Sequence, residues 1–233
     1  MKNNITCLLD TEHTVAKELF ENEEYPHKVI SHIKEFILRK GNELPKDMYE
    51  CINGDIWIAK SAKVALSACI EGPCIIDENS EIRHCAYIRG SVIVGKGVVV
   101  GNSTEVKNSV LFDNVQVPHF NYIGDSVLGY KVHFGAGSIT SNVKNDKTEI
   151  FISYDEHKIP SGYNKLGTIV GDNAEIGCGS VLNPGTVIGR NVSIYPLSSV
   201  RGEIEENTIY KSEDQIIKKQ LNADIIQNTA ITE

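Results

Sequence analysis

The fold is decided by residues 64–106, VALSACIEGPCIIDENSEIRHCAYIRGSVIVGKGVVVGNSTEV, which carry an aliphatic residue at every sixth position. The same spacing reaches back to Ile52, and it returns between Val170 and Val200. The residue two positions before each of these aliphatic residues is small in most units. Ordinary helices and strands repeat about every 3.6 and 2 residues, so a constant period of six indicates a solenoid of short strands.

Each six-residue unit describes one short strand and one corner. Three such sides close a coil of about 18 residues, and coils stack about 4.8 Å apart, like strands in a sheet. The large and the small residue of each unit then point inward. Glycine recurs just after the aliphatic position, as at Gly95, Gly101 and Gly171, where a corner can need a positive φ. The pattern predicts an all-β protein built as a parallel β-helix over residues 48–208.

The ends of the chain lie outside the repeat. We expect residues 1–47 to form a helical cap, with one helix over 11–21 and a second over 26–41. Such helices would cover an end of the prism or make contacts between copies of the chain. In the tail, 209–233, Ser212 and Gln215 form a capping-box pattern that predicts a terminal helix.

The repeat is broken in three places. The step from Val106 to Val117 covers eleven residues instead of twelve, and the step from Ile123 to Leu128 covers five instead of six. The repeat then stops, and we interpret residues 141–168 as an arm that leaves the prism, with a strand pair around 148–158. Breaks in an otherwise regular repeat either mark a functional site or are tolerated insertions.

Composition excludes some functions. The net charge is −8 and the sequence pI about 5.4, which argues against a general nucleic-acid-binding or membrane-surface role. No apolar run approaches the length of a membrane span, and the first residues lack a signal-peptide pattern. The six cysteines form no CxxC pair, so we interpret them as thiols of a cytoplasmic protein.

Two cations are spaced by one coil. Arg89 and Lys107 are 18 residues apart and each follows a core aliphatic residue, so they should stack at one corner of successive coils. Like charges this close repel and usually require an anion. Glu71, one coil earlier, is a possible internal partner. Allowing for the shortened step, Gly124 comes next in the column, which leaves room for a phosphate.

His119 stands at the first irregularity, in VPHFNYIGD, with Tyr122 three residues later. An imidazole displayed there could act as a general base that deprotonates an amine. Asn102 falls in the same predicted column and could orient the ring. The alternative is that His119 is only a polar surface residue.

Residues 101–147, GNSTEVKNSVLFDNVQVPHFNYIGDSVLGYKVHFGAGSITSNVKNDK, resemble a known family. They look like the acetyltransferase domain of the bifunctional N-acetylglucosamine-1-phosphate uridyltransferase/glucosamine-1-phosphate acetyltransferase. They look closer still to the archaeal sugar-1-phosphate nucleotidylyltransferases with a similar C-terminal domain. The resemblance covers about 85–205, and it implies that the β-helix is left-handed.

The resemblance also implies site residues. The family's base histidine falls on His119, and its phosphate-holding arginine and lysine fall on Arg89 and Lys107. Further substrate-binding positions fall on the residues Tyr122, His133, Asn142 and Lys147. The family members are homotrimers that use acetyl-CoA, with no metal required for the transfer, and their CoA sites lie between adjacent prisms. Candidates for the CoA side are the residues Cys178, Asn183, Tyr195 and Arg201.

The implied activity is acetyl transfer from acetyl-CoA to an amino-sugar 1-phosphate. The sequence departs from the family in three ways: His133 replaces an asparagine, Cys178 replaces a serine, and the nucleotidyltransferase domain is not found in this chain. A non-catalytic sugar-phosphate-binding or regulatory module is therefore an alternative. A γ-class carbonic anhydrase is a more remote one, because that family needs a second zinc ligand five residues after the first, where this chain has Gly124.

Overall fold

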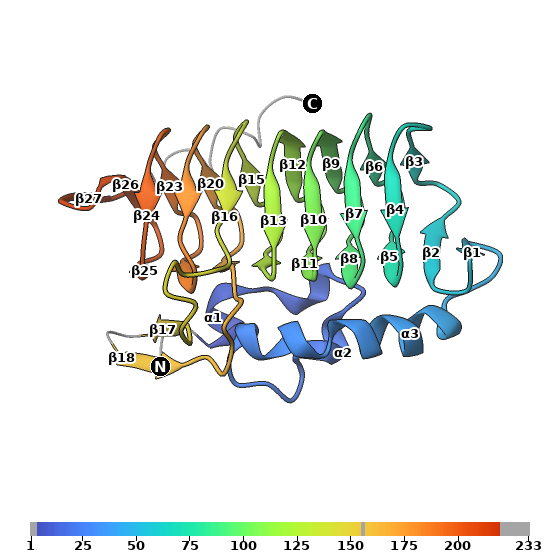
Figure 1. Ribbon diagram of the computed structural model, residues 1–233, viewed down its shortest axis with the longest axis horizontal. Helices are drawn as coiled ribbons and strands as arrows, with labels where there is room; N and C mark the ends of the chain where they lie inside the picture. Colours follow the sequence, from blue (N-terminus) through green and yellow to red (C-terminus); the bar gives the residue numbers. More distant parts are fainter. Residues whose placement is uncertain (1–3, 155–156, 220–233) are drawn as a thin grey trace, which may run out of the picture.

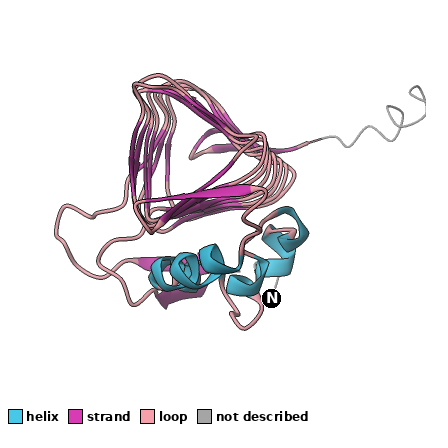
Figure 2. Cartoon of the chain, turned by 90° about the vertical axis from the view of Figure 1, so that its right-hand side faces the viewer, coloured by secondary structure: helices cyan, strands magenta, loops and turns pink. Residues whose placement is uncertain are grey.

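The computed structural model describes residues 4–154 and 157–219. Its main body is a three-sided prism of parallel strands, seen end-on in Figure 2 and from the side in Figure 1. The chain passes through the three sheets in turn, so that strand partners within one sheet come from successive coils. The predicted β-helix is confirmed.

We name the three sheets A, B and C. Sheet A contains, in spatial order, β1 (Tyr49–Ile52), β2 (Ile56–Ala59), β5 (Cys74–Ile76), β8 (Val92–Val94), β11 (Ser109–Leu111), β14 (Val127–Leu128), β19 (Thr168–Val170), β22 (Thr186–Ile188) and β25 (Glu203–Ile204). Sheet B contains β3 (Lys63–Val64), β6 (Glu81–Ile82), β9 (Val99–Asn102), β12 (Gln116–His119), β15 (His133–Phe134), β20 (Glu175–Ile176), β23 (Ser193–Ile194), β26 (Thr208–Ser212) and β27 (Gln215–Lys218). Sheet C contains β4 (Cys69–Glu71), β7 (Tyr87–Arg89), β10 (Glu105–Lys107), β13 (Tyr122–Gly124), β16 (Ile139–Thr140), β21 (Val181–Leu182) and β24 (Ser199–Val200).

The interior of the prism is filled by the residues of the six-residue period. Ile76, Ile82 and Ile88 are fully or almost fully buried, and they come from sheets A, B and C in that order. The strand register shows the coil length directly. Cys74 pairs with Val92 across sheet A, eighteen residues on. In the shortened region the step falls to seventeen, as where Glu105 pairs with Tyr122.

Sheet A differs from the other two because its outward residues are also buried. Ile75, Ile93, Val110 and Val127 are fully buried although they alternate with the inward positions of their strands. The N-terminal segment covers them with α1 (Ile5–Leu8), η1 (Thr11–His13), α2 (Lys17–Phe20), η2 (Pro26–Ser31) and α3 (Ile33–Glu43). In Figure 2 these helices lie along one side of the triangle.

From the sequence we expected the N-terminal segment to cap an end of the prism, but it does not. It runs along a side face, with α3 against β5 and β8. The helix expected over 11–21 is also interrupted. Thr14 is extended (φ −159°), and its hydroxyl accepts a hydrogen bond from Ala16 N at 3.1 Å, which competes with the helical bond.

The arm carries the predicted strand pair, as β17 (Phe151–Tyr154) and β18 (His157–Pro160). It leaves sheet C after β16 and returns to sheet A at β19. Ile152 and Leu166 are fully buried, and β17 packs on β22 and β25. The arm thus covers the part of sheet A that the helices leave open.

The terminal helix predicted to begin at Ser212 is wrong over the described part of the tail. Ser212 and Gln215 close an antiparallel hairpin between β26 and β27, and the two residues between them form its turn. The hairpin forms because β23 offers an unpaired edge to β26, and the strand-favouring Ile216 and Ile217 continue the pairing. The rest of the predicted helix lies outside the described residues.

Among the described residues, no helix is both long and apolar enough to cross a bilayer.

Candidate functional site

A column of side chains runs along the outer surface of sheet C, next to the corner with sheet A. Glu71 pairs with Arg89 in the strand register, and Lys107 pairs with Gly124. The register pairs Ile88 of β7 with Val106 of β10, so the residues that follow them, Arg89 and Lys107, are neighbours in this column. The stacking that the spacing predicts is present.

Both cations have carboxylate partners within the chain. Arg89 Nη1 lies 2.6 Å from Glu105 Oε1, and the two side chains are 43% and 32% exposed. This hydrogen bond raises the pKa of Arg89 above its ordinary value. Lys107 Nζ lies 3.2 and 3.3 Å from the two oxygens of Asp125. Glu71, the internal partner considered from the sequence, instead accepts a hydrogen bond from Tyr87 at 2.9 Å.

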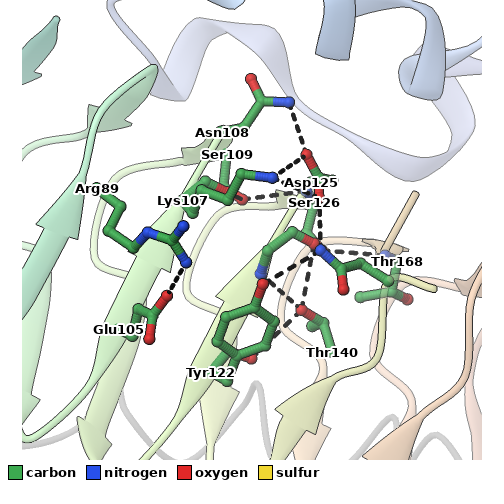
Figure 3. Close-up of polar contacts among 12 residues, drawn as sticks. Arg89, Glu105, Lys107, Asn108, Ser109, Tyr122, Asp125, Ser126, Thr140 and Thr168 are labelled. Carbon is green, nitrogen blue, oxygen red and sulfur yellow. Dashed lines mark hydrogen bonds and ion pairs between the residues drawn. The ribbon is translucent and has the colours of Figure 1, made fainter. Parts of the chain in front are cut away.

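Asp125 is the centre of a buried polar network, shown in Figure 3. Its side chain is 4% exposed. Besides Lys107 it accepts hydrogen bonds from Asn108 Nδ2 at 2.8 Å and from Asn142 Nδ2 at 2.5 Å. Asn108 and Asp125 have positive φ, 45° and 49°, at the two shortened corners of successive coils. The missing residue at each corner thus brings these two side chains together.

Tyr122 is held by the same network. Asn142 Nδ2 donates to its hydroxyl at 3.2 Å, and the Tyr122 hydroxyl donates to none of the described residues, so its proton is available for a ligand. Burial raises the pKa of Tyr122, which keeps it protonated at neutral pH. Thr140 Oγ1 accepts the Gly124 N–H at 2.9 Å and ties the next coil to this one. Arg89, Lys107 and Tyr122 therefore present N–H and O–H donors on one face.

His119 is the last residue of β12 on sheet B, at the corner where the chain passes to sheet C. It pairs with Asn102 in the register, as the predicted column requires. Among the described residues, Asn102 makes no hydrogen bond to the ring; its Oδ1 accepts from Ser103 Oγ at 2.8 Å. Within residues 4–154 and 157–219, the exposed imidazole of His119 makes no hydrogen bond. Gly101 permits the close approach of β9 and β12, since a Cβ there would stand 1.7 Å from the Pro118 carbonyl oxygen.

The structure does not bring all predicted substrate residues together. His119 ends β12 on sheet B and Tyr122 begins β13 on sheet C, so the two residues lie on either side of one corner of the prism. The cations lie beyond Tyr122, at the opposite corner. His133 lies on sheet B, where its Nδ1 is 2.8 Å from Glu175 Oε2 in an open surface groove. Lys147 is exposed on the arm, and its side chain forms no hydrogen bond or ion pair with the described residues.

The four candidates for the CoA side lie in later coils. Asn183 is buried, and its amide donates to Ser199 Oγ and to the Val200 carbonyl. These two bonds connect it to the next coil of the prism. Arg201 is exposed directly after β24 of sheet C. Cys178 is exposed at the corner that also holds His119. Tyr195 is 45% exposed, with Lys211 Nζ 5.4 Å from its ring centre.

Sequence reasoning missed Glu105, Asn108 and Asp125. The shortened repeats were a usable signal, because both missing residues fall at the corners that carry Asn108 and Asp125. Glu105 gave no comparable signal: it is an ordinary outward residue of β10, and only the conformation of its side chain pairs it with Arg89.

Two family models match this chain. One is described as "GMPPB C-terminal domain" and covers residues 70–150; the other is "Bacterial transferase hexapeptide (six repeats)" and covers 167–202. The interval between the two matches contains the β17–β18 hairpin. Both matches fall within the prism and the root of the arm.

Curated relatives are similar over the same region. The "Bifunctional protein GlmU" of Methanococcus maripaludis is 36% identical over 138 residues, 59% of this chain and 33% of the relative. The "Bifunctional sugar-1-phosphate nucleotidylyltransferase/acetyltransferase" of Sulfurisphaera tokodaii is 34% identical over 161 residues, 61% of this chain and 40% of the relative. The chain therefore spans between a third and two fifths of the relatives' length.

Among solved structures, a mutant of AntD, an N-acyltransferase from Bacillus cereus in complex with dTDP and coenzyme A, is 17% identical. The alignment covers 75% of this chain and 87% of AntD, with a TM-score of 0.38, too low to bear on function. The sequence matches, the six-residue period and the three-sheet prism agree with one another. The repeat region of this chain is a left-handed β-helix of the hexapeptide-repeat type, similar to the repeat-containing part of the GlmU-type bifunctional proteins.

Proposed function

We propose that this chain is an acyltransferase that moves an acetyl group from acetyl-CoA to the amine of an amino-sugar 1-phosphate. The observation that carries the proposal is the Arg89–Lys107 column, with Lys107 and Tyr122 held in place by the buried Asp125–Asn142 network. The similarity to a sugar-1-phosphate nucleotidylyltransferase/acetyltransferase supports the reaction class.

The sugar phosphate is proposed to bind Arg89 and Lys107. Glu105 is an exposed partner of Arg89, and an exposed ion pair contributes little to stability, so a phosphate can replace it on the guanidinium. The planar guanidinium of arginine can donate two parallel N–H bonds to a phosphate as it can to a carboxylate. Lys107 can keep its two contacts with the Asp125 carboxylate while its third N–H donates outward, next to the Tyr122 hydroxyl.

His119 is proposed as the general base. Its imidazole, unpaired within the described residues, takes a proton from the sugar amine as the amine nitrogen attacks the thioester carbonyl. The new N–C bond forms, the C–S bond of acetyl-CoA breaks, and the CoA sulfur leaves as the thiol after it receives a proton. Holding amine and thioester together supplies a large part of the rate enhancement. No residue of this chain is assigned as the oxyanion donor.

The proposed active form is a homotrimer. His133 lies at the start of β15 on sheet B, and the cations lie at the ends of β7 and β10 on sheet C, so a ligand that contacts all three side chains is proposed to bind between two copies of the chain. Sheet C of one copy and sheet B of its neighbour would then form one site, with Cys178, Tyr195 and Arg201 on the CoA side. Light scattering during gel filtration should give three times the 25.7 kDa of one chain. A monomer would contradict this part of the proposal.

The reaction is tested by release of free CoA from acetyl-CoA, with glucosamine 1-phosphate and galactosamine 1-phosphate as acceptors. His119→Ala should lower kcat about 100-fold or more with little change in KM for the sugar, because general-base catalysis contributes about 10²–10⁴-fold. Arg89→Ala should chiefly raise that KM. Arg83→Ala is the matched control, since Arg83 forms a similar exposed pair with Glu81 on sheet B.

The proposal fails if neither sugar phosphate is acetylated by the wild-type trimer. If the wild type then still binds sugar phosphate, and Arg89→Ala weakens that binding, the alternative of a non-catalytic binding module is supported instead. Equal effects of Arg89→Ala and Arg83→Ala would exclude the cation column as the phosphate site in either case.

A further inference from the structure

A separate cluster of reactive side chains lies at the corner between sheets B and C, away from the cation column. Cys85 Sγ is 3.3 Å from His84 Nε2, and His84 Nδ1 is 2.7 Å from Ser67 Oγ. Ser67 Oγ also accepts the backbone N–H of Cys85 at 3.3 Å. All three residues are exposed. A thiol, an imidazole and a hydroxyl are thus joined in one chain of contacts on the surface.

We propose that Cys85 is a nucleophilic thiol that undergoes exchange with small-molecule disulfides and so forms a reversible mixed disulfide. His84 acts as its general base, and Ser67 positions His84. A nucleophile within hydrogen-bond reach of a base, which is itself oriented by a third group, is the arrangement that activates thiols and hydroxyls in enzymes. This inference does not depend on the proposed acetyl transfer.

The contacts of Ser67 are compatible with the tautomer that the reaction needs. Ser67 Oγ already accepts one hydrogen bond, from Cys85 N, and it can accept a second from His84 Nδ1–H. In that tautomer Nε2 carries the lone pair and faces the thiol. The backbone bond from Cys85 to Ser67 also links the two coils, which fixes the three side chains relative to one another.

The other cysteines of the chain lack such a base. Cys51, Cys69 and Cys178 are exposed, and within residues 4–154 and 157–219 none of them forms a hydrogen bond with an imidazole. Cys74 is fully buried, and burial raises its pKa to about 12, which makes it unreactive. The exposed cysteines therefore serve as internal references for Cys85 in the same protein.

The exchange step balances without a further reactant. His84 Nε2 takes the thiol proton as Cys85 Sγ attacks one sulfur of the disulfide. One S–S bond forms to Cys85 and the original S–S bond breaks. The departing sulfur receives the proton from the His84 imidazolium and leaves as a thiol. A second small thiol reverses the reaction.

A group attached to Cys85 would lie near His119, the proposed general base. His84 precedes Asn102 and His119 in one corner column, two coils or about 10 Å from His119. A group attached to Cys85 would project from the corner that carries His119. The attached group would thus lie beside the surface that the acetyl transfer is proposed to use.

The test is the labelling rate of each cysteine in the intact protein, measured by peptide mass spectrometry with oxidised glutathione and, separately, with iodoacetamide. Cys85 should react at least about tenfold faster than Cys51 and Cys69 near pH 7. His84→Asn should bring the Cys85 rate to within about twofold of the Cys69 rate, since the base is lost. The rates of Cys51 and Cys178 should not change, which confirms that the variant is folded.

Ser67 provides the second variant. Ser67→Ala should slow labelling of Cys85, whereas Ser67→Thr, which keeps the hydroxyl, should retain the wild-type rate. The proposal is overturned if Cys85 reacts no faster than Cys69, or if its rate is the same in wild type and His84→Asn. Fast labelling by iodoacetamide without any mixed disulfide from oxidised glutathione would overturn the disulfide-exchange assignment.

Discussion

At the scale of single residues, the most constrained group in the candidate site is Asp125. Its carboxylate is almost fully buried and accepts hydrogen bonds from Lys107, Asn108 and Asn142. Taking a carboxylate out of water is costly unless charge and hydrogen bonds replace its hydration. Here three donors from two parts of the chain, the adjacent Lys107 and Asn108 and the more distant Asn142, replace it. Asp125 therefore acts on the site through Lys107 and Tyr122, whose positions it sets.

We predict that Asp125→Asn destabilises the protein by about 2–4 kcal/mol, because it leaves Lys107 partly buried without its counter-charge. The free energy of unfolding from urea denaturation measures this effect. Glu105→Gln is the control: it also removes a carboxylate from a cation, but from an exposed pair, so stability should stay unchanged within error. Equal losses in both variants would contradict the central role of Asp125.

At the scale of elements, the arm and the N-terminal segment are joined through His27. The imidazole is fully buried, and its Nδ1 lies 3.1 Å from the hydroxyl of Tyr154 on β17. Tyr154 also stacks on Tyr25, with ring centres 4.7 Å apart. Lys28 Nζ donates to the Ser161 carbonyl at 3.2 Å. Because the root of the arm carries Asn142, the N-terminal segment supports the Asp125 network indirectly.

Burial, together with the neighbouring Lys28, lowers the pKa of His27 to about 3. In the unfolded chain the ordinary histidine pKa applies, so only the unfolded state binds this proton between about pH 6.5 and 3. Stability is therefore fully present above pH 6.5 and falls as the pH decreases, by up to about 1.4 kcal/mol per pH unit.

Comparing the free energy of unfolding at pH 7.5 and pH 5 checks this prediction. His27→Gln should lose less stability than the wild type between these two pH values. His32→Gln, which changes an exposed histidine of the same segment, should follow the wild-type curve. A His27→Gln curve parallel to the wild type would show that the acid sensitivity has another origin.

At the scale of the whole molecule, one face of the prism is closed and two are open. Sheet A is buried on both sides, by the interior of the prism and by the helices and the arm (Figures 1 and 2). Sheets B and C carry the exposed candidate residues. Covering sheet A thus leaves sheets B and C available for ligands and for a second copy of the chain.

We predict that Ile93→Ala costs about 2–4 kcal/mol of stability although its side chain points away from the prism, because it is fully buried beneath α3. Val64→Ala on β3 of sheet B is the control; Val64 is 38% exposed, and its truncation should cost under about 1 kcal/mol. The free energy of unfolding from urea denaturation measures the loss of stability in each variant. A small effect at Ile93 would mean that the helices do not cover sheet A in solution.

Part of this architecture is readable in the sequence because it follows from spacing alone. The aliphatic positions determine the coil, and the coil length determines that Arg89 stands next to Lys107. The burial of sheet A on both faces also had a signal, in the continuous apolar runs Cys74–Ile76 and Val92–Val94, which are typical of a sheet covered on two sides. These runs predict that the N-terminal helices cover a side of the prism rather than its end.

The rest depends on contacts between residues far apart in the chain. The six-residue period, and with it the prism, the stacked cations and the departure of the arm at 141–168, are local and repetitive properties that the sequence determines by itself. The carboxylates that pair with Arg89 and Lys107, the face that the N-terminal segment covers, and the separation of His133 from the cations were decided by the tertiary structure. Side-chain conformations and long-range packing select among arrangements that share the same periodic pattern, so the period cannot specify them.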